Sequence, residues 1–98
     1  MLVPADFQRV VADSKLTREE LAALYGVTRQ TIHYWVKVSP PHGGGIGARM
    51  AEVITVALVN AIDRKALPLG GMSREARKIK IAGMARTLQN LKPAPVNL

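Results

Sequence analysis

The sequence predicts an all-α fold, a small helical domain of about five helices. Its 98 residues include 48% apolar types, enough for a hydrophobic core in a chain of this length. Proline and glycine interrupt the chain at 39–47 and 67–71 and exclude a continuous helix there. Between these breaks, apolar residues recur at the three- and four-residue spacing of a helix.

The first helix is expected to begin near Pro4, because proline suits a first helical turn. Phe7, Val10 and Val11 then follow at helical spacing and give this segment one apolar face.

Capping residues predict the second and third helices. Thr17 and Glu20 form a capping box, in which the hydroxyl accepts one backbone N–H and the carboxylate reaches back to another. Gly26 ends the second helix, where a left-handed residue is commonly required. Thr28 caps the third helix, which continues to about Lys37.

Two longer helices are predicted in the second half. The fourth, at about 47–66, carries a wide apolar stripe. Its β-branched run 53–59 also fits a strand, but no partner strand is visible, and 48–52 favours helix. The fifth begins near Ser73, with apolar residues on one face and basic residues elsewhere, and ends at Lys92.

These elements predict one compact domain with four regions. Residues 1–38 form a helix-turn-helix region and 39–47 a proline- and glycine-rich loop. Residues 48–92 form a helical region for oligomerisation or support, and 93–98 form a flexible tail.

Residues 17–37 predict a helix-turn-helix, because two short helices flank a three-residue turn that contains glycine. The helices must cross closely, so a small residue is wanted at the crossing, and Ala22 supplies it. An ordinary helical hairpin is the alternative. The small residue, the glycine, the buried positions and both caps nevertheless fall in the register of a DNA-binding module. The predicted core of this unit is Leu21, Ala22, Gly26, Val27, Ile32 and Trp35.

The segment from Leu21 to Lys37 resembles the helix-turn-helix of phage Cro and CI repressors and related small bacterial regulators. The match covers about residues 5–38, and the sequence beyond Lys37 follows no pattern of that family. The resemblance implies that the N-terminal residues of the third helix enter the major groove of DNA.

The exposed positions of that helix are the candidates for base contacts. Arg29 can pair bidentately with guanine and Gln30 with adenine. Thr31 can offer its methyl group to thymine or its hydroxyl to a phosphate, whereas His33 is either a base contact or a solvated side chain. The base-contact candidates are Thr28, Arg29, Gln30, Thr31 and His33.

A second set is expected to contact phosphates. Thr17 and Arg18 lie where free backbone N–H groups and a positive charge suit a phosphate, and Lys37 is expected to touch the DNA backbone as well. Tyr34 either bonds a phosphate or packs against the first helix. Trp35, by its spacing from Ile32, is assigned to the core.

The net charge of +7 favours a polyanionic partner, but it is distributed unevenly. Residues 1–45 hold five basic and four acidic residues, whereas 46–98 hold nine basic and three acidic residues. Whether the cations of the fifth helix flank DNA or face water therefore stays open. These cations are Arg74, Arg77, Lys78 and Lys80.

One recognition helix reads few bases, so we expect a homodimer that reads two half-sites of a palindrome. The fourth helix is apolar over more than one face and is the predicted interface. The interface candidates are Met50, Val53, Val56 and Val59.

Other classes of function are disfavoured. No cysteine is present and the two histidines are far apart, so we expect no metal site. No arrangement of Ser, His and Asp is suggested, and the few carboxylates fit surface or capping positions, so we expect no catalytic residues and no cofactor. The glycines at 43–47 lack the Gly-Lys-Ser/Thr ending of a phosphate-binding loop, and no small-molecule substrate is evident. The start predicts no signal peptide, and no segment is long enough to span a membrane, which favours a cytoplasmic protein.

The sequence thus predicts a non-enzymatic, sequence-specific regulator of transcription that binds double-stranded DNA, in the manner of a Cro-like phage or prophage repressor. One alternative is a DNA-packaging adaptor similar to a small terminase subunit, in which helices after the helix-turn-helix build a ring. Another is a helix-turn-helix protein that serves mainly protein–protein interaction, which the near-neutral N-terminal half keeps open.

Overall fold

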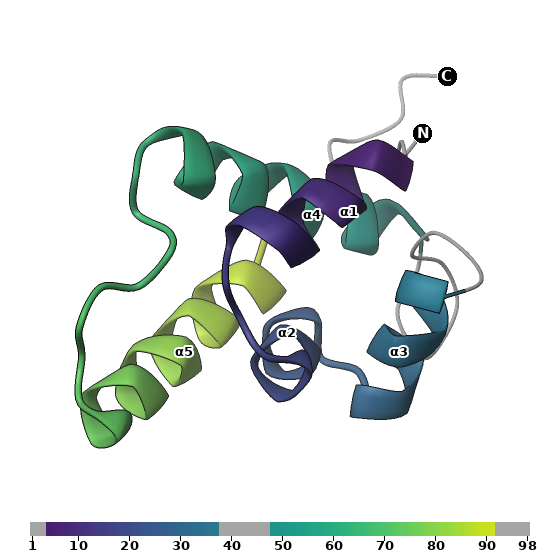
Figure 1. The fold of residues 1–98 in the computed structure, drawn as a ribbon. Helices are drawn as coiled ribbons and strands as arrows, with labels where there is room; N and C mark the ends of the chain where they lie inside the picture. Colours follow the sequence, from purple (N-terminus) through teal and green to yellow (C-terminus); the bar gives the residue numbers. More distant parts are fainter. Residues whose placement is uncertain (1–3, 38–47, 92–98) are drawn as a thin grey trace.

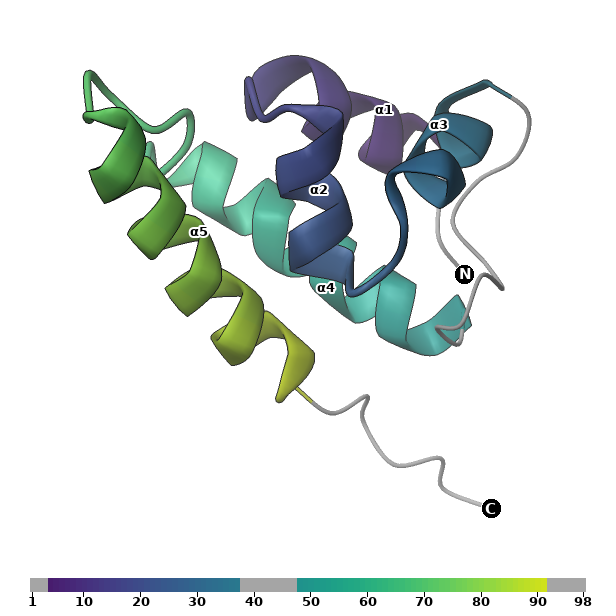
Figure 2. The ribbon, with the colours of Figure 1, turned by 90° about the horizontal axis from the view of Figure 1, so that it is seen from below.

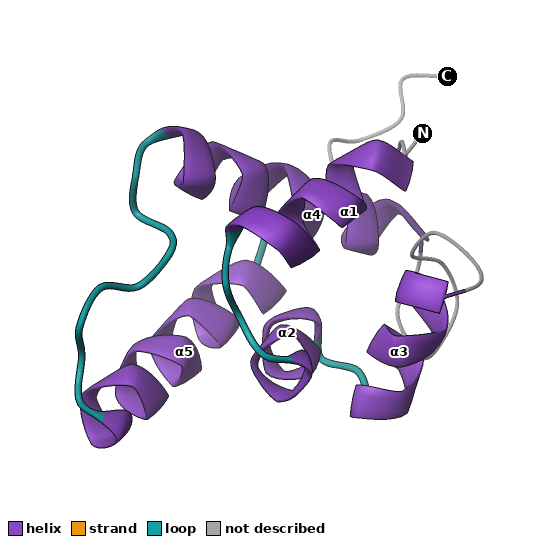
Figure 3. Ribbon diagram, viewed as in Figure 1, coloured by secondary structure: helices purple, strands orange, loops and turns teal. Residues whose placement is uncertain are grey.

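The computed structural model describes residues 4–37 and 48–91 and contains five helices there and no strand (Figures 1 and 3). The all-α prediction is confirmed, and the β-branched run 53–59 is helical. The predicted loop 39–47 and tail 93–98 lie outside the described residues. The helices are α1 (Pro4–Asp13), α2 (Arg18–Tyr25), α3 (Arg29–Lys37), α4 (Ala48–Asp63) and α5 (Arg74–Gln89).

Local capping explains where several helices begin. The capping box of α2 is present: the Glu20 N–H donates to the Thr17 hydroxyl at 3.1 Å, and the Thr17 N–H donates to the Glu20 carboxylate at 2.9 Å. The Ser73 hydroxyl accepts the Ala76 N–H at the start of α5. Helix α4 ends at Asp63, earlier than the predicted 66, and Lys65 then turns the chain with a positive φ of 64°.

Three aromatic rings form the centre of the core. Phe7 of α1, Tyr25 of α2 and Trp35 of α3 meet edge to face, with ring centroids 5.6 to 6.0 Å apart. Each of the three residues is at most 2% exposed. Buried side chains of α4 and α5, including Leu58 and Ile81, continue the same cluster, so the two halves of the chain share one core.

Helix α2 is the central element. It packs against α3 on one side and α5 on the other, while α1 packs against α4 (Figures 1 and 2). The C-terminal half therefore supports the helix-turn-helix directly.

Candidate nucleic-acid interface

The turn between α2 and α3 is closed by backbone hydrogen bonds. The N–H groups of Gly26 and Val27 both donate to the Ala22 carbonyl, at 2.9 and 3.0 Å. Gly26 adopts the left-handed conformation, with φ 72° and ψ 35°, which an L side chain rarely adopts. This geometry ends α2 and directs the chain into α3.

The predicted helix-turn-helix core lies largely inside the protein. Leu21 and Ile32 are fully buried, Ala22 and Trp35 are nearly so, and Val27 is half-buried. Because Trp35 is buried, its ring is not exposed for a DNA base to stack on. Gly26 is exposed at the turn.

Four predicted DNA-contacting residues come together on the outer surface. Arg18 begins α2, and the exposed side chains of Arg29, Gln30 and His33 lie in the first half of α3. Together they line a shallow depression of about 290 Å³. A depression lined by two guanidinium groups, an amide and an imidazole presents hydrogen-bond donors to a polyanion and two groups suited to base edges.

Two predicted base contacts, Thr28 and Thr31, also start α3. The Thr28 hydroxyl accepts the Thr31 N–H at 3.1 Å and shares a hydrogen bond of 2.9 Å with the Thr31 hydroxyl. The bond between the two hydroxyls uses one of their two hydrogens, so one hydroxyl hydrogen remains free to donate without breaking the cap. In contrast, the side chains of Arg29 and Gln30 are exposed beside them.

The phosphate-contact candidates differ in availability. Tyr34 is 52% exposed, so it does not pack inside against α1. Lys37 is exposed in the last turn of α3. The Thr17 N–H and a lone pair of its hydroxyl are used by the capping box, which leaves the hydroxyl hydrogen to donate.

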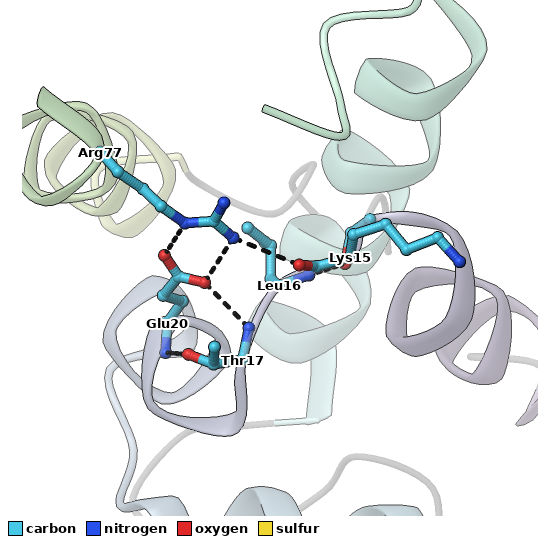
Figure 4. A network of polar contacts seen from close by, with 6 residues as sticks. Lys15, Leu16, Thr17, Glu20 and Arg77 are labelled. Atoms are coloured by element: carbon cyan, nitrogen blue, oxygen red, sulfur yellow. Dashed lines mark hydrogen bonds and ion pairs between the residues drawn. The ribbon is translucent and has the colours of Figure 1, made fainter. Parts of the chain in front are cut away.

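A network at the start of α2 joins it to α5 (Figure 4). The Arg77 guanidinium donates to both Glu20 carboxylate oxygens, from Nε at 2.5 Å and from Nη2 at 2.9 Å, and Nη2 also donates to the Lys15 carbonyl at 3.2 Å. These bonds lower the pKa of Glu20, because the Arg77 guanidinium favours the ionised carboxylate, and the same pair raises the pKa of Arg77. Arg77 therefore binds Glu20 and the Lys15 carbonyl, while its side chain stays 31% exposed.

The other end of α2 is also held by α5. The Gln89 Nε2 donates to the Ala23 carbonyl at 2.7 Å, so it satisfies a carbonyl of the last turn of α2. Sequence reasoning identified neither Arg77 nor Gln89 as a support of the helix-turn-helix. Their partners lie 57 and 66 residues away, and no local pattern indicates such a pair.

The dimer-interface candidates on α4 differ in how much of each side chain is exposed. Val56 is 50% exposed, whereas Val53 is half-buried. Met50 and Val59 are half-buried because they pack against the protein's own core. Val56 is therefore the candidate with the most apolar surface to offer a partner.

A groove of about 650 Å³ separates α4 from α5. Its lining is mainly apolar, and the charged side chains in it are both basic. Residues that line it include Ala57, Ala61, Arg64, Lys80, Met84 and Leu88.

No three His, Cys, Asp or Glu side chains within residues 4–37 and 48–91 are grouped so that they could hold a metal ion. Over the same residues, no helix has both the length and the apolar composition that crossing a membrane requires. Comparison with protein-family models, with curated proteins and with solved structures gives no match. The likeness to Cro and CI repressors therefore stays a prediction from residues 5–38.

Proposed function

We propose that this protein binds double-stranded DNA sequence-specifically and regulates transcription by occluding polymerase at an operator, as a Cro-like repressor does. The observation that carries the proposal is the depression on the outer face of the helix-turn-helix. There Arg18 meets the exposed Arg29, Gln30 and His33 of α3.

The mechanism follows from the chemistry of these side chains. With α3 in the major groove, Arg29 pairs with guanine and Gln30 with adenine, and each bidentate pair discriminates against a wrong base by about 1–3 kcal/mol. Arg18 binds phosphate and sets the register without reading sequence. No cofactor enters this mechanism.

The experiment selects binding sites from a random duplex pool and then measures affinity for selected and scrambled duplexes at several salt concentrations. Arg29→Ala and Gln30→Ala are expected to lose preference at one base position each, whereas Arg18→Ala weakens binding to all duplexes and flattens the salt dependence. Gln8→Ala, which removes an exposed amide from α1, serves as the control. Equal loss on all duplexes from Gln30→Ala would contradict base readout by this residue.

We further propose that a homodimer binds two half-sites about one helical turn apart, through the exposed face of α4. Val56→Asp places a charge at the half-exposed valine, and we expect it to impair self-association and DNA affinity together. Gln8→Glu adds the same charge at an exposed polar site of α1, outside the exposed face of α4, and is the matched control.

Light scattering decides the assembly. The dimer is supported if the parent protein has the mass of two copies and the Val56→Asp variant has the mass of one. An unchanged mass for Val56→Asp would place the interface elsewhere, and a mass of about eight or more copies would favour the packaging adaptor.

A further inference from the structure

We propose that Arg74 and Lys78 of α5 form a second phosphate-binding surface beside the helix-turn-helix. The proposal rests on the proposed DNA-binding function and extends its footprint. It assigns a role to part of the positive charge that lies beyond residue 45.

The first contact that positions this surface is the network of Arg77. Because Arg77 bonds both oxygens of Glu20 and the Lys15 carbonyl, the beginning of α5 is fixed beside the beginning of α2 (Figure 4). Arg18, the predicted phosphate contact, lies at that same end of α2. In Figure 1, the first turns of α3 and α5 both lie along the lower edge of the molecule.

Helical geometry divides the cations of α5 between two faces. Lys78 precedes Gln89 by eleven residues, so the two side chains leave the helix within about 20° of each other. Since Gln89 bonds the Ala23 carbonyl, Lys78 shares the side of α5 that adjoins α2. Arg74 lies one turn before Lys78 on nearly the same side, and both side chains are exposed.

Lys80 belongs to the opposite side. It leaves the helix about 160° away from Lys78, and it lines the groove against α4 together with Arg64. Lys80 and Arg64 are also exposed. Lys80 and Arg64 therefore provide a control for Lys78 and Arg74: they are also one lysine and one arginine, but they lie on a face that does not adjoin α2.

The charge balance beside α2 favours a phosphate. Glu20 carries a carboxylate in the first turn of α2, and the Arg77 fork neutralises it. The remaining ionic side chains of this region give an excess of two positive charges. They are the cations Lys15, Arg18, Arg74 and Lys78 and the carboxylates Glu19 and Glu75.

The test measures the slope of log affinity against log salt concentration on the selected duplex. The slope changes by about 0.9 for each phosphate that the protein no longer neutralises. Arg74→Ala with Lys78→Ala is expected to flatten the slope by about 1.8 without changing base preference, whereas Arg64→Ala with Lys80→Ala leaves the slope unchanged. Arg74→Lys with Lys78→Arg retains both charges and is expected to keep the parent slope.

The outcomes separate this proposal from the function on which it rests. If the double variant Arg74→Ala with Lys78→Ala keeps the salt slope of the parent, the second phosphate-binding surface is overturned. The proposed function survives that result if the base preference of the parent protein still depends on Gln30. The second surface is also overturned if Arg64→Ala with Lys80→Ala flattens the salt slope as much as Arg74→Ala with Lys78→Ala does. The effect would then depend on the net charge of the protein and not on the position of the cations. A parent that does not bind duplex DNA overturns both proposals. Helical content by circular dichroism confirms that each variant is folded.

Discussion

Gly26→Ala tests how tightly the helix-turn-helix is fixed. The residue has φ 72°, and for an L side chain the left-handed conformation costs roughly 1–2 kcal/mol. A Cβ atom built there would lie 3.1 Å from Gln89 Oε1 and 3.2 Å from Gln89 Cδ. The amide of Gln89 can move away, but it then loses its bond to the Ala23 carbonyl, which contributes about 0.5–1.5 kcal/mol.

These contributions set the expected magnitude. Alanine also restricts the unfolded chain, which returns about 0.4–1 kcal/mol to the folded state. The net loss is therefore about 0.5–3 kcal/mol, with a central value of about 2 kcal/mol. For a domain of this length, each kcal/mol lowers Tm by about 4–8 °C. Thermal unfolding followed by circular dichroism measures the shift, and urea unfolding gives the free energy.

Two further variants identify the cause. Gly83→Ala lies inside α5 with no atom within 4 Å of the added Cβ, so it is expected to raise stability, by up to about 1 kcal/mol. In a Gln89→Ala background the crowding is absent, and Gly26→Ala should cost only the backbone strain. If Gly26→Ala were as stable as the parent, the left-handed turn and its contact with α5 would not constrain the helix-turn-helix as argued.

Two other substitutions test the contacts that join distant helices. Arg77→Met is expected to lower Tm at pH 7. The pKa of Glu20 is lowered in the folded state from its ordinary value near 4.5. The ion pair with Arg77 therefore stabilises the fold at pH values above 4.5, and this stabilisation is lost as the pH falls below that value and the carboxylate is protonated. The Tm difference from the parent should therefore narrow in acid, and a constant difference would contradict the ion pair. Tyr25→Phe removes the 2.5 Å hydrogen bond to the buried Thr55 hydroxyl and is expected to cost about 1–3 kcal/mol in urea unfolding. Adding Thr55→Val should recover much of that loss, because no buried hydroxyl is then left unpaired. No recovery would mean that the loss comes from the space left by the Tyr25 hydroxyl and not from an unpaired Thr55.

The helix-turn-helix could be predicted because its signals are local. The Thr17 cap acts through Glu20, three residues away, and Gly26 adopts the left-handed conformation that its place after an apolar face predicts. The edge-to-face aromatic core could be predicted only in part. Apolar spacing indicates that Trp35 is internal, but not that it meets Phe7 and Tyr25.

The packing of α5 could not be predicted, because amphipathic periodicity shows which face is apolar and not which helix covers it. Arg77 and Lys78 are adjacent basic residues with the same signal in the sequence. One is fixed to Glu20, and the other is exposed. The difference depends on the register between α5 and α2, which arises only when the whole core assembles. The same holds for Val56 and Val59, of which one is exposed and the other packs inward.

This register also links the fold to the proposed function. The capping box uses the carboxylate of Glu20, yet that carboxylate lies in the first turn of α2, where a DNA phosphate is expected to bind. Arg77 allows both, because its fork neutralises the carboxylate while the Thr17 N–H still bonds it. Without α5, the first turn of α2 would present two unneutralised carboxylates, Glu19 and Glu20, to the phosphate. The second half of the chain therefore contributes to the electrostatics of the proposed DNA contact as well as to its core.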